Sequence, residues 1–238
     1  MQTIRQMLCV FVGLILLGGC AGPVPEDIPE QPVLPAEIYA ALETMKLIRA
    51  ATVVHLDDTA WIIASLGPDH DPGETIRIEQ SDVLDGQLDV RLHIDSSGND
   101  SETATHWTVG STDQSYDWAT FTVEGEVYPQ VITFEQPLSA PLAFGNRAVL
   151  FTAAQTNGLL EVTGIAQVYE ATLSYLVEDA DGNILREDFV NTASGGPDWG
   201  TFRIFEESLL ETSLNLVLLE EDAADGGMRI LLEHPVGQ

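Results

Sequence analysis

Residues 172–190 read TLSYLVEDADGNILREDFV and contain two short apolar segments on either side of a turn. In the first segment Leu173, Tyr175 and Val177 recur at every second position, which is the pattern of a strand with one buried face. Asp181-Gly182-Asn183 separates the two segments, and its glycine supplies the positive φ that a tight hairpin turn needs. The stretch therefore predicts an antiparallel hairpin.

Similar short segments continue to the end of the chain. The expected strands are Leu159 to Gln167, Thr172 to Glu178, Ile184 to Val190, Gly200 to Phe205, Ser213 to Glu220 and Met228 to Glu233. Short strands at near-regular spacing, separated by turn residues, are typical of a β-sandwich. Gln155 to Gly158 marks a boundary before them, so we expect a sandwich domain over residues 158–236. The chain has no Cys-Trp-Cys pattern, which argues against an antibody-type domain.

Residues 36–154 predict a second, β-rich (α+β) domain with one N-terminal helix. Ile38, Leu42 and Met45 recur at helical spacing within Ala36 to Ala50, and Pro35 suits a helix start. The expected strands are Thr52 to Leu56, Ala60 to Leu66, Glu74 to Gln80, Leu88 to Ile94, His106 to Val109, Thr120 to Glu124, Val127 to Phe134 and Arg147 to Ala153. The predicted fold class is mainly β.

The first 22 residues, MQTIRQMLCVFVGLILLGGCAG, have the features of a secretory signal. Arg5 provides a positive charge, and the apolar run from Met7 to Leu17 is about half the ~20 residues that span a bilayer. Leu17-Gly18-Gly19-Cys20 resembles the lipobox of bacterial lipoproteins. The resemblance implies a signal peptide over residues 1–19, cleavage before Cys20 and diacylation of its thiol. The alternative is an ordinary signal peptide with a chance cysteine.

Residues 20–35 would then form a lipidated cysteine followed by a tether. The segment AGPVPEDIPEQPVLP, residues 21–35, contains five prolines and three acidic residues, a composition that predicts a stiff, extended, solvated chain. Its length and charge would hold the folded part away from lipid headgroups.

The chain is strongly acidic, with 38 acidic residues, 9 basic residues and a net charge of −29. Such a chain is repelled by anionic lipids, so we expect membrane attachment through acyl chains. Nucleic acid is excluded as a partner because phosphate binding needs a basic surface. Solubility, a saline habitat and a cationic partner are three explanations of the acidity that composition does not separate.

The C-terminal domain resembles the immunoglobulin-like domain of bacterial spore germination proteins. The segments that carry the resemblance are Val162 to Ala166, Tyr169 to Ala171, Asp181-Gly182, Gly195 to Phe202 and Leu214 to Glu221. The resemblance covers about residues 158–236. It implies a β-sandwich placed on an extracytoplasmic or membrane-anchored protein, without enzymatic activity.

The upstream domain is similar to the C-terminal domain of an accessory subunit that stabilises a secreted protease complex. The similar segments are Ala60 to Gly67, Glu74 to Glu79, Leu88 to Leu92 and Tyr128 to Ile132. That pattern has Gly-Tyr where this chain has Gly73-Glu74. The similarity implies an alternative function as an accessory or regulatory subunit of an extracellular protease complex.

We expect no catalytic residue and no cofactor-binding residue. There is no Gly-x-Ser-x-Gly, and Ser194 before Gly195-Gly196 is interpreted as part of a flexible connection. Acidic pairs such as Glu206-Glu207 are too frequent to indicate a glycosidase site. An extracytoplasmic hydrolase is the third functional alternative.

No metal ligand is predicted either, because His55, His70, His93, His106 and His234 lack metal-ligand spacing. Calcium is the best cofactor candidate, since it takes oxygen ligands. Asp179 to Asn183 resembles the opening of a calcium loop, but its glycine comes two residues early and a hairpin turn is favoured. Asp69-His70-Asp71 and Asp95 to Asp100 are weaker candidates.

Two polar loops contain a tryptophan: Asn191 to Gly200 with Trp199, and Ser96 to Tyr116 with Trp107. Such a tryptophan either anchors a partner or packs on the core, and packing is favoured. Together these features predict a lipid-anchored protein on the extracytoplasmic face of a cell membrane or envelope. Its immunoglobulin-like domain would bind or scaffold a protein or another cell-envelope partner.

Overall fold

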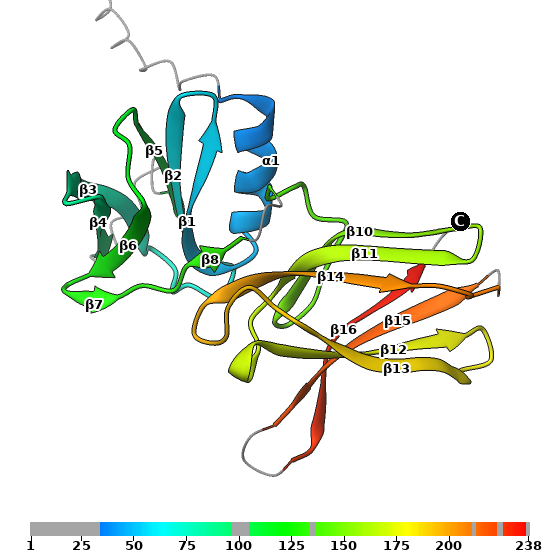
Figure 1. Ribbon diagram of the computed structural model, residues 1–238. Helices are drawn as coiled ribbons and strands as arrows, with labels where there is room; N and C mark the ends of the chain where they lie inside the picture. Colours follow the sequence, from blue (N-terminus) through cyan, green and yellow to red (C-terminus); the bar gives the residue numbers. More distant parts are fainter. Residues whose placement is uncertain (1–33, 97–104, 134–136, 211–212, 223–225, 237–238) are drawn as a thin grey trace, which may run out of the picture. The chain divides into compact units, whose positions relative to one another are not determined.

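The computed structural model describes residues 34–96, 105–133, 137–210, 213–222 and 226–236, and in them the mainly β fold class is confirmed (Figure 1). The described residues fall within one unit, Leu34–Gln238. Helix α1 (Ala36–Met45) precedes the strands and starts directly after Pro35. The buried side chains of α1 include Ile38, Leu42 and Met45, as the helical spacing predicts.

The helix is shorter than the predicted Ala36 to Ala50. It ends at Met45, and β1 begins at Arg49. Arg49 and Ala50 pair with Leu66 and Ser65 of β2, so their backbone groups bond across a sheet instead of along a helix.

Two sheets form the N-terminal half of the described chain. The first has the order β1-β2-β5, from Arg49–Leu56, Thr59–Leu66 and Trp107–Thr112. The second has the order β3-β4-β6-β7, from Thr75–Leu84, Gln87–Asp95, Trp118–Val123 and Glu126–Val127. A tight turn joins β3 to β4, where Asp85 and Gly86 both have positive φ.

The first sheet is apolar on both faces, because each face packs against another layer of the structure. Ile62 and Ala64 of β2 pack against the second sheet, in a cluster that contains Val90 of β4 and Phe121 of β6. Ile63, which points the other way, belongs to a cluster with helix α1. The sheet is therefore buried between α1 and the second sheet.

The predicted strand from Val127 to Phe134 was wrong as a continuous element. β7 ends at Val127 and pairs with β6, whereas β8 (Val131–Ile132) pairs in parallel with a strand of the C-terminal sheets. Pro129 lies between them and has no N–H to donate to a ladder. Its carbonyl accepts a hydrogen bond from the Ala51 N–H at 2.8 Å.

The C-terminal half is a two-sheet sandwich. One sheet has the order β8-β14-β11-β10-β9, in which β9 is Ala143–Phe144, β10 is Ala148–Thr156, β11 is Leu159–Ala166 and β14 is Trp199–Glu206. The other has the order β13-β12-β15-β16, from Ile184–Asn191, Thr172–Asp179, Leu214–Glu221 and Met228–Val236. Both sheets contribute buried side chains to one core, as a sandwich requires.

Strand β10 belongs to this sandwich. It forms a hairpin with β11 along its length, and Ala148 and Leu150 lie in the sandwich core. The sheet therefore begins before the boundary that the sequence places at residues 155–158. Val149, on the opposite face of β10, joins the cluster that contains helix α1.

Candidate binding surface

Strand alternation determines which side chains of the sheet β13-β12-β15-β16 point away from the sandwich core. The residues of β12 and β15 that enter the core are Leu173, Tyr175, Val177, Leu214, Leu216 and Leu218. Because successive side chains point to opposite faces, Leu176, Val217 and Leu219 lie on the outer face. This face is therefore apolar at the centre of the sheet.

The strand register places further residues beside them in two cross-strand rows. The first row consists of Phe189, Ser174, Leu219 and Ile230. The second row consists of Glu187, Leu176, Val217 and Glu233. We call these eight residues the outer-face patch.

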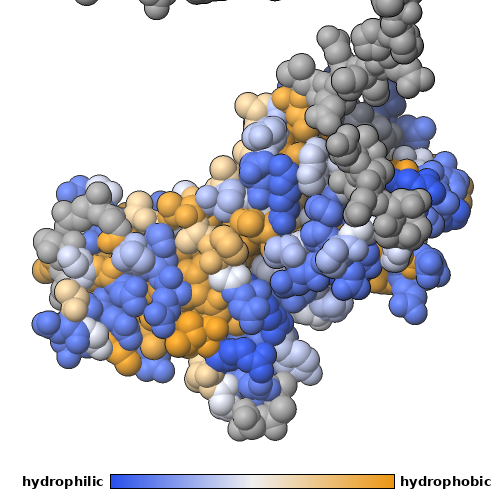
Figure 2. Space-filling model, turned by 180° about the vertical axis from the view of Figure 1, so that it is seen from behind, coloured by the Kyte–Doolittle hydropathy of each residue, from blue (hydrophilic) through white to orange (hydrophobic). Residues whose placement is uncertain are grey.

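The outer-face patch exposes large apolar side chains at its two edges. Phe189 on β13 is 59% exposed and Ile230 on β16 is 52% exposed, whereas Val217 and Leu219 between them are buried. Figure 2 shows hydrophobic side chains at the rear surface of the C-terminal half, bordered by hydrophilic ones. Phe189 and Ile230 lie in one cross-strand row, and exposed apolar residues grouped on one face mark interaction sites more often than residues scattered singly do.

The outer-face patch was not predicted from the sequence. A signal was present, because the run LNLVLLEE of Leu214–Glu221 is apolar at Val217 and Leu219 as well as at the alternating leucines. A strand that is apolar on both faces is either covered by protein on both faces or exposes an apolar surface to which another molecule can bind.

A cavity of about 270 Å³ lies next to one end of the patch. Its lining residues are Tyr169, Glu170, Thr172, Ser174, Glu220 and Glu221. Tyr169 is 57% exposed, and the next two residues, Glu170 and Ala171, both have positive φ. Non-glycine residues in this conformation carry backbone strain, which proteins tend to keep at functional sites.

Glu220, in the wall of this cavity, is buried, and both of its carboxylate oxygens accept hydrogen bonds. One carboxylate oxygen accepts a hydrogen bond from Arg147 Nη1 at 2.6 Å, and the other accepts one from the Tyr169 N–H at 2.7 Å. Glu220 therefore links the Tyr169 N–H to Arg147, the residue directly before β10, and acts as a structural residue.

Both tryptophans of the polar loops pack on the core, as favoured from the sequence. Trp199 is 6% exposed and lies at the start of β14, in the cluster that also contains α1 residues. Trp107 is half-buried against the same cluster, and Lys46 Nζ lies 5.1 Å from the centre of its ring. Neither tryptophan is presented as an anchor for a partner.

A second cavity, of about 590 Å³, lies where the end of α1 meets the C-terminal sandwich. Arg49, Asp69, Phe144, Asn146 and Trp199 are among its lining residues. Arg49 also faces the ring of Tyr128, whose pKa is raised to about 12, chiefly by burial. The Tyr128 hydroxyl donates a hydrogen bond to the Ser65 carbonyl at 2.6 Å, so this side chain links β2 to the chain after β7.

The hairpin turn at Asp179 to Asn183 is confirmed. Asp179 Oδ1 accepts hydrogen bonds from the N–H groups of Asp181 and Asn183, each at 2.9 Å, and Oδ2 accepts one from the Asn183 amide. Gly182 has a φ of 81°. These bonds hold the pKa of Asp179 below its ordinary value, with the Asn183 side chain as the largest cause. The turn already uses the carboxylate that a calcium ion would need.

The other metal candidates are Asp69-His70-Asp71, which lies within the described residues, and Asp95 to Asp100, most of which lies outside them. His70 Nδ1 hydrogen-bonds to the Gly67 carbonyl, and its ring lies 3.7 Å from that of His106, centre to centre. Within the described part of the chain, no three His, Cys, Asp or Glu side chains gather as a metal site would require.

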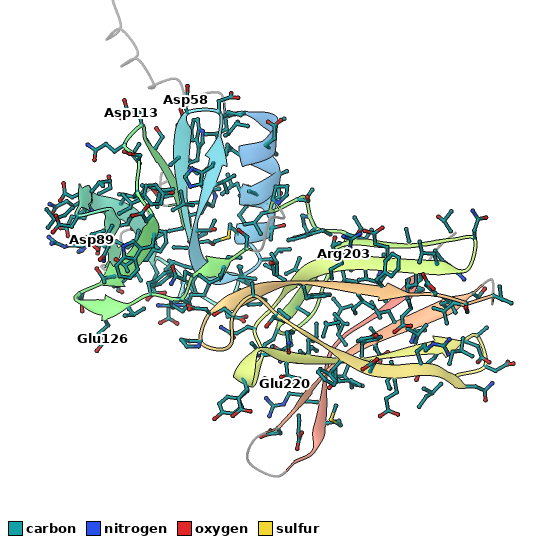
Figure 3. All side chains as sticks on the ribbon, in the orientation of Figure 1. Asp58, Asp89, Asp113, Glu126, Arg203 and Glu220 are labelled. Atoms are coloured by element: carbon teal, nitrogen blue, oxygen red, sulfur yellow. The ribbon has the colours of Figure 1, made fainter. Side chains whose placement is uncertain are left out.

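The acidic side chains that Figure 3 labels do not converge on one point. Asp58, Asp89, Asp113 and Glu126 belong to the N-terminal half, and Glu220 lies on β15. Ser194 lies in the loop before β14, and its hydroxyl donates to the Gly195 carbonyl. The Tyr175 hydroxyl donates one hydrogen bond to Glu206, and the burial of Tyr175 together with this bond raises the pKa of Tyr175.

Cys20, the predicted lipidation site, lies outside the described residues, together with the signal and most of the tether. Among the helices that the structure describes, none has the length and hydrophobicity needed to span a bilayer.

Comparison with curated proteins found no match to this chain. Comparison with family models found one for the C-terminal part, and the matched residues begin in β10 and end at the turn before β16. The matched region thus contains β11, β12, β13, β14 and β15, which are strands of both sheets of the sandwich. Residues 151–227 match the Gmad2 family, the immunoglobulin-like domain of bacterial spore germination, and this domain indicates a binding or structural module.

Proposed function

We propose that this protein is a membrane-tethered lipoprotein that presents its immunoglobulin-like domain as a binding module outside the cytoplasm. Acyl chains on Cys20 anchor the chain, the proline-rich segment of residues 21–35 spaces it from the lipid, and the sandwich binds a partner.

The outer-face patch is the observation that supports binding most directly. Phe189 and Ile230 are large apolar side chains at the two edges of a regular sheet face, and both are more than half exposed. Exposing them to water is unfavourable. Because each is already almost half buried, covering it completely with a partner gains roughly 0.8–1.5 kcal/mol, about half the value for a fully exposed side chain. A rigid sheet also loses little entropy when a partner docks on it.

The anchor is tested by mass spectrometry of the amino-terminal peptide from membranes of cells that produce the protein. We expect a chain that begins at Cys20 with a diacylglyceryl group on its thiol, and a Cys20→Ala variant that is neither lipidated nor cleaved at this point. Cys9→Ala is the matched control, since Cys9 lies within the signal and its loss should leave processing unchanged. A free thiol at Cys20 in the wild-type chain contradicts the proposal.

The binding role is tested separately by cross-linking in membranes and affinity recovery of the protein. The wild-type chain should recover a partner that a Phe189→Ser/Ile230→Ser variant with the same melting temperature recovers much less. Recovery of a secreted protease through a surface of the N-terminal sheets, unaffected by these two substitutions, would instead support the accessory-subunit alternative.

A further inference from the structure

Every charged residue of the outer sheet face within the described residues is a glutamate. By strand alternation, Glu187 and Glu233 lie in the outer-face patch, and Glu178 and Glu221 lie in the rows on either side of it. All four are absent from the ion pairs that the described residues form. Four negative charges thus surround the apolar centre.

The neighbouring cations are directed elsewhere. Arg186 on β13 pairs with Glu206 of β14, across the edge of the sandwich. Arg229 on β16 pairs with Asp222, and Arg147, which directly precedes β10, pairs with Glu220. The sheet face therefore keeps an uncompensated negative potential around exposed apolar side chains.

Charge complementarity selects among possible occupants of this face. A second copy docked face to face would bring its own four glutamates against these four, which is unfavourable. An anionic lipid surface is repelled for the same reason. The tether of this chain is acidic at Glu26, Asp27 and Glu30, so it does not complement the face either.

We propose that the outer-face patch binds a basic amphipathic segment of another protein, with apolar side chains on Phe189 and Ile230 and Lys or Arg side chains against Glu187 and Glu233. This inference rests on the proposed function and specifies the partner's chemistry. Apolar contact supplies affinity, and the surrounding carboxylates steer association and orient the segment. It also gives the chain's acidity a specific role on this face, in place of general solubility.

The probe for the test is a synthetic peptide of alternating leucine and lysine, compared with a peptide that has glutamate in place of every lysine. Binding to the full-length protein is measured by fluorescence anisotropy at two salt concentrations, in detergent solution so that the assay does not depend on a lipid anchor. We expect binding of the leucine–lysine peptide that weakens as salt rises, and no measurable binding of the leucine–glutamate peptide.

Two pairs of variants separate the outer-face patch from the protein's overall acidity. Glu187→Gln/Glu233→Gln should weaken binding about tenfold and flatten its salt dependence. Glu124→Gln/Glu126→Gln removes the same charge at the β6–β7 turn, and it should change the affinity by no more than about twofold.

The apolar contribution is tested in the same way. Phe189→Ser/Ile230→Ser should weaken binding about tenfold or more. Leu84→Ser removes a side chain that is 68% exposed on β3, so it should have little effect. Thermal melting of each variant shows whether the sandwich is intact.

Equal losses in the two glutamate pairs would overturn the inference, because the peptide would then be attracted by net charge alone. Unchanged binding in the Phe189→Ser/Ile230→Ser variant would overturn it as well. Neither result bears on Cys20, and an unmodified Cys20 thiol with intact peptide binding would reject the anchor while leaving this inference standing.

Discussion

Replacing Trp199 with alanine tests whether helix α1 and the C-terminal sandwich depend on one shared core. Trp199 is 6% exposed and lies in the cluster that contains Ile38 of α1 and Ile165 of β11. A buried tryptophan removes about 150–250 Å² from water, which at about 25 cal/mol per Å² corresponds to about 4–6 kcal/mol. Measured losses for Trp→Ala in cores are about 3–5 kcal/mol. We therefore expect a loss of about 4 kcal/mol in the free energy of unfolding.

The assay is urea unfolding followed by circular dichroism and by tryptophan fluorescence. Because the cluster joins the two halves, both signals should shift together to lower urea in Trp199→Ala. The control is Phe205→Ala on the same strand, whose side chain is 51% exposed and whose loss should be within about 1 kcal/mol. A loss below about 1 kcal/mol for Trp199→Ala, or a shift in one signal alone, would refute the shared core.

Three further substitutions probe single contacts. Tyr128→Phe removes the hydrogen bond to the Ser65 carbonyl and should cost about 1 kcal/mol at neutral pH. Since burial raises the pKa of Tyr128 from 10.0 to about 12, the unfolded chain ionises first, and this residue contributes a fall in stability of about 2–3 kcal/mol between pH 10 and 12. The variant should therefore show a shallower alkaline decline in urea titrations, and an unchanged decline would contradict this reasoning. Glu220→Gln leaves Arg147 without its partner and, because that arginine is partly exposed, should cost about 1–3 kcal/mol in thermal or urea unfolding. Gly200→Ala places a Cβ against the backbone of Ala193 and Ser194 and should cost about 1–3 kcal/mol by the same measurement, and a neutral result would show that this loop yields easily.

The strands that the sequence predicted well are those with local signals. The hairpin of β12 and β13 follows from alternation in Leu173, Tyr175 and Val177 and from the glycine in its turn, and both signals act within a few residues. Helix α1 was predicted too long because Ile48 continues the helical spacing, although its side chain is buried in the turn before β1. Sequence spacing does not tell a buried turn residue from a helical one.

The candidate binding surface was not predictable in this way. Leu176 and Phe189 come from one hairpin, β12–β13, and Leu219 and Ile230 come from another, β15–β16. The two hairpins are separated in the sequence by β14, and only the pairing of β12 with β15 brings them onto one face. The two tryptophans were predicted more successfully, because packing on the core was favoured for Trp107 and Trp199 and both side chains pack inward. Residue type left partner contact open as the alternative, and the tertiary structure decides between the two.

The sequence by itself determined the mainly β class, the hairpin turns and the resemblance of the C-terminal part to an immunoglobulin-like domain, since these depend on periods and turn residues that are read locally. The tertiary structure decided that β10 joins the sandwich, that the chain from Val127 to Ile132 divides between two sheets, and that glutamates surround an apolar sheet face. These depend on which strands become neighbours. That choice is made by burial summed over the whole core, which no single segment of sequence contains.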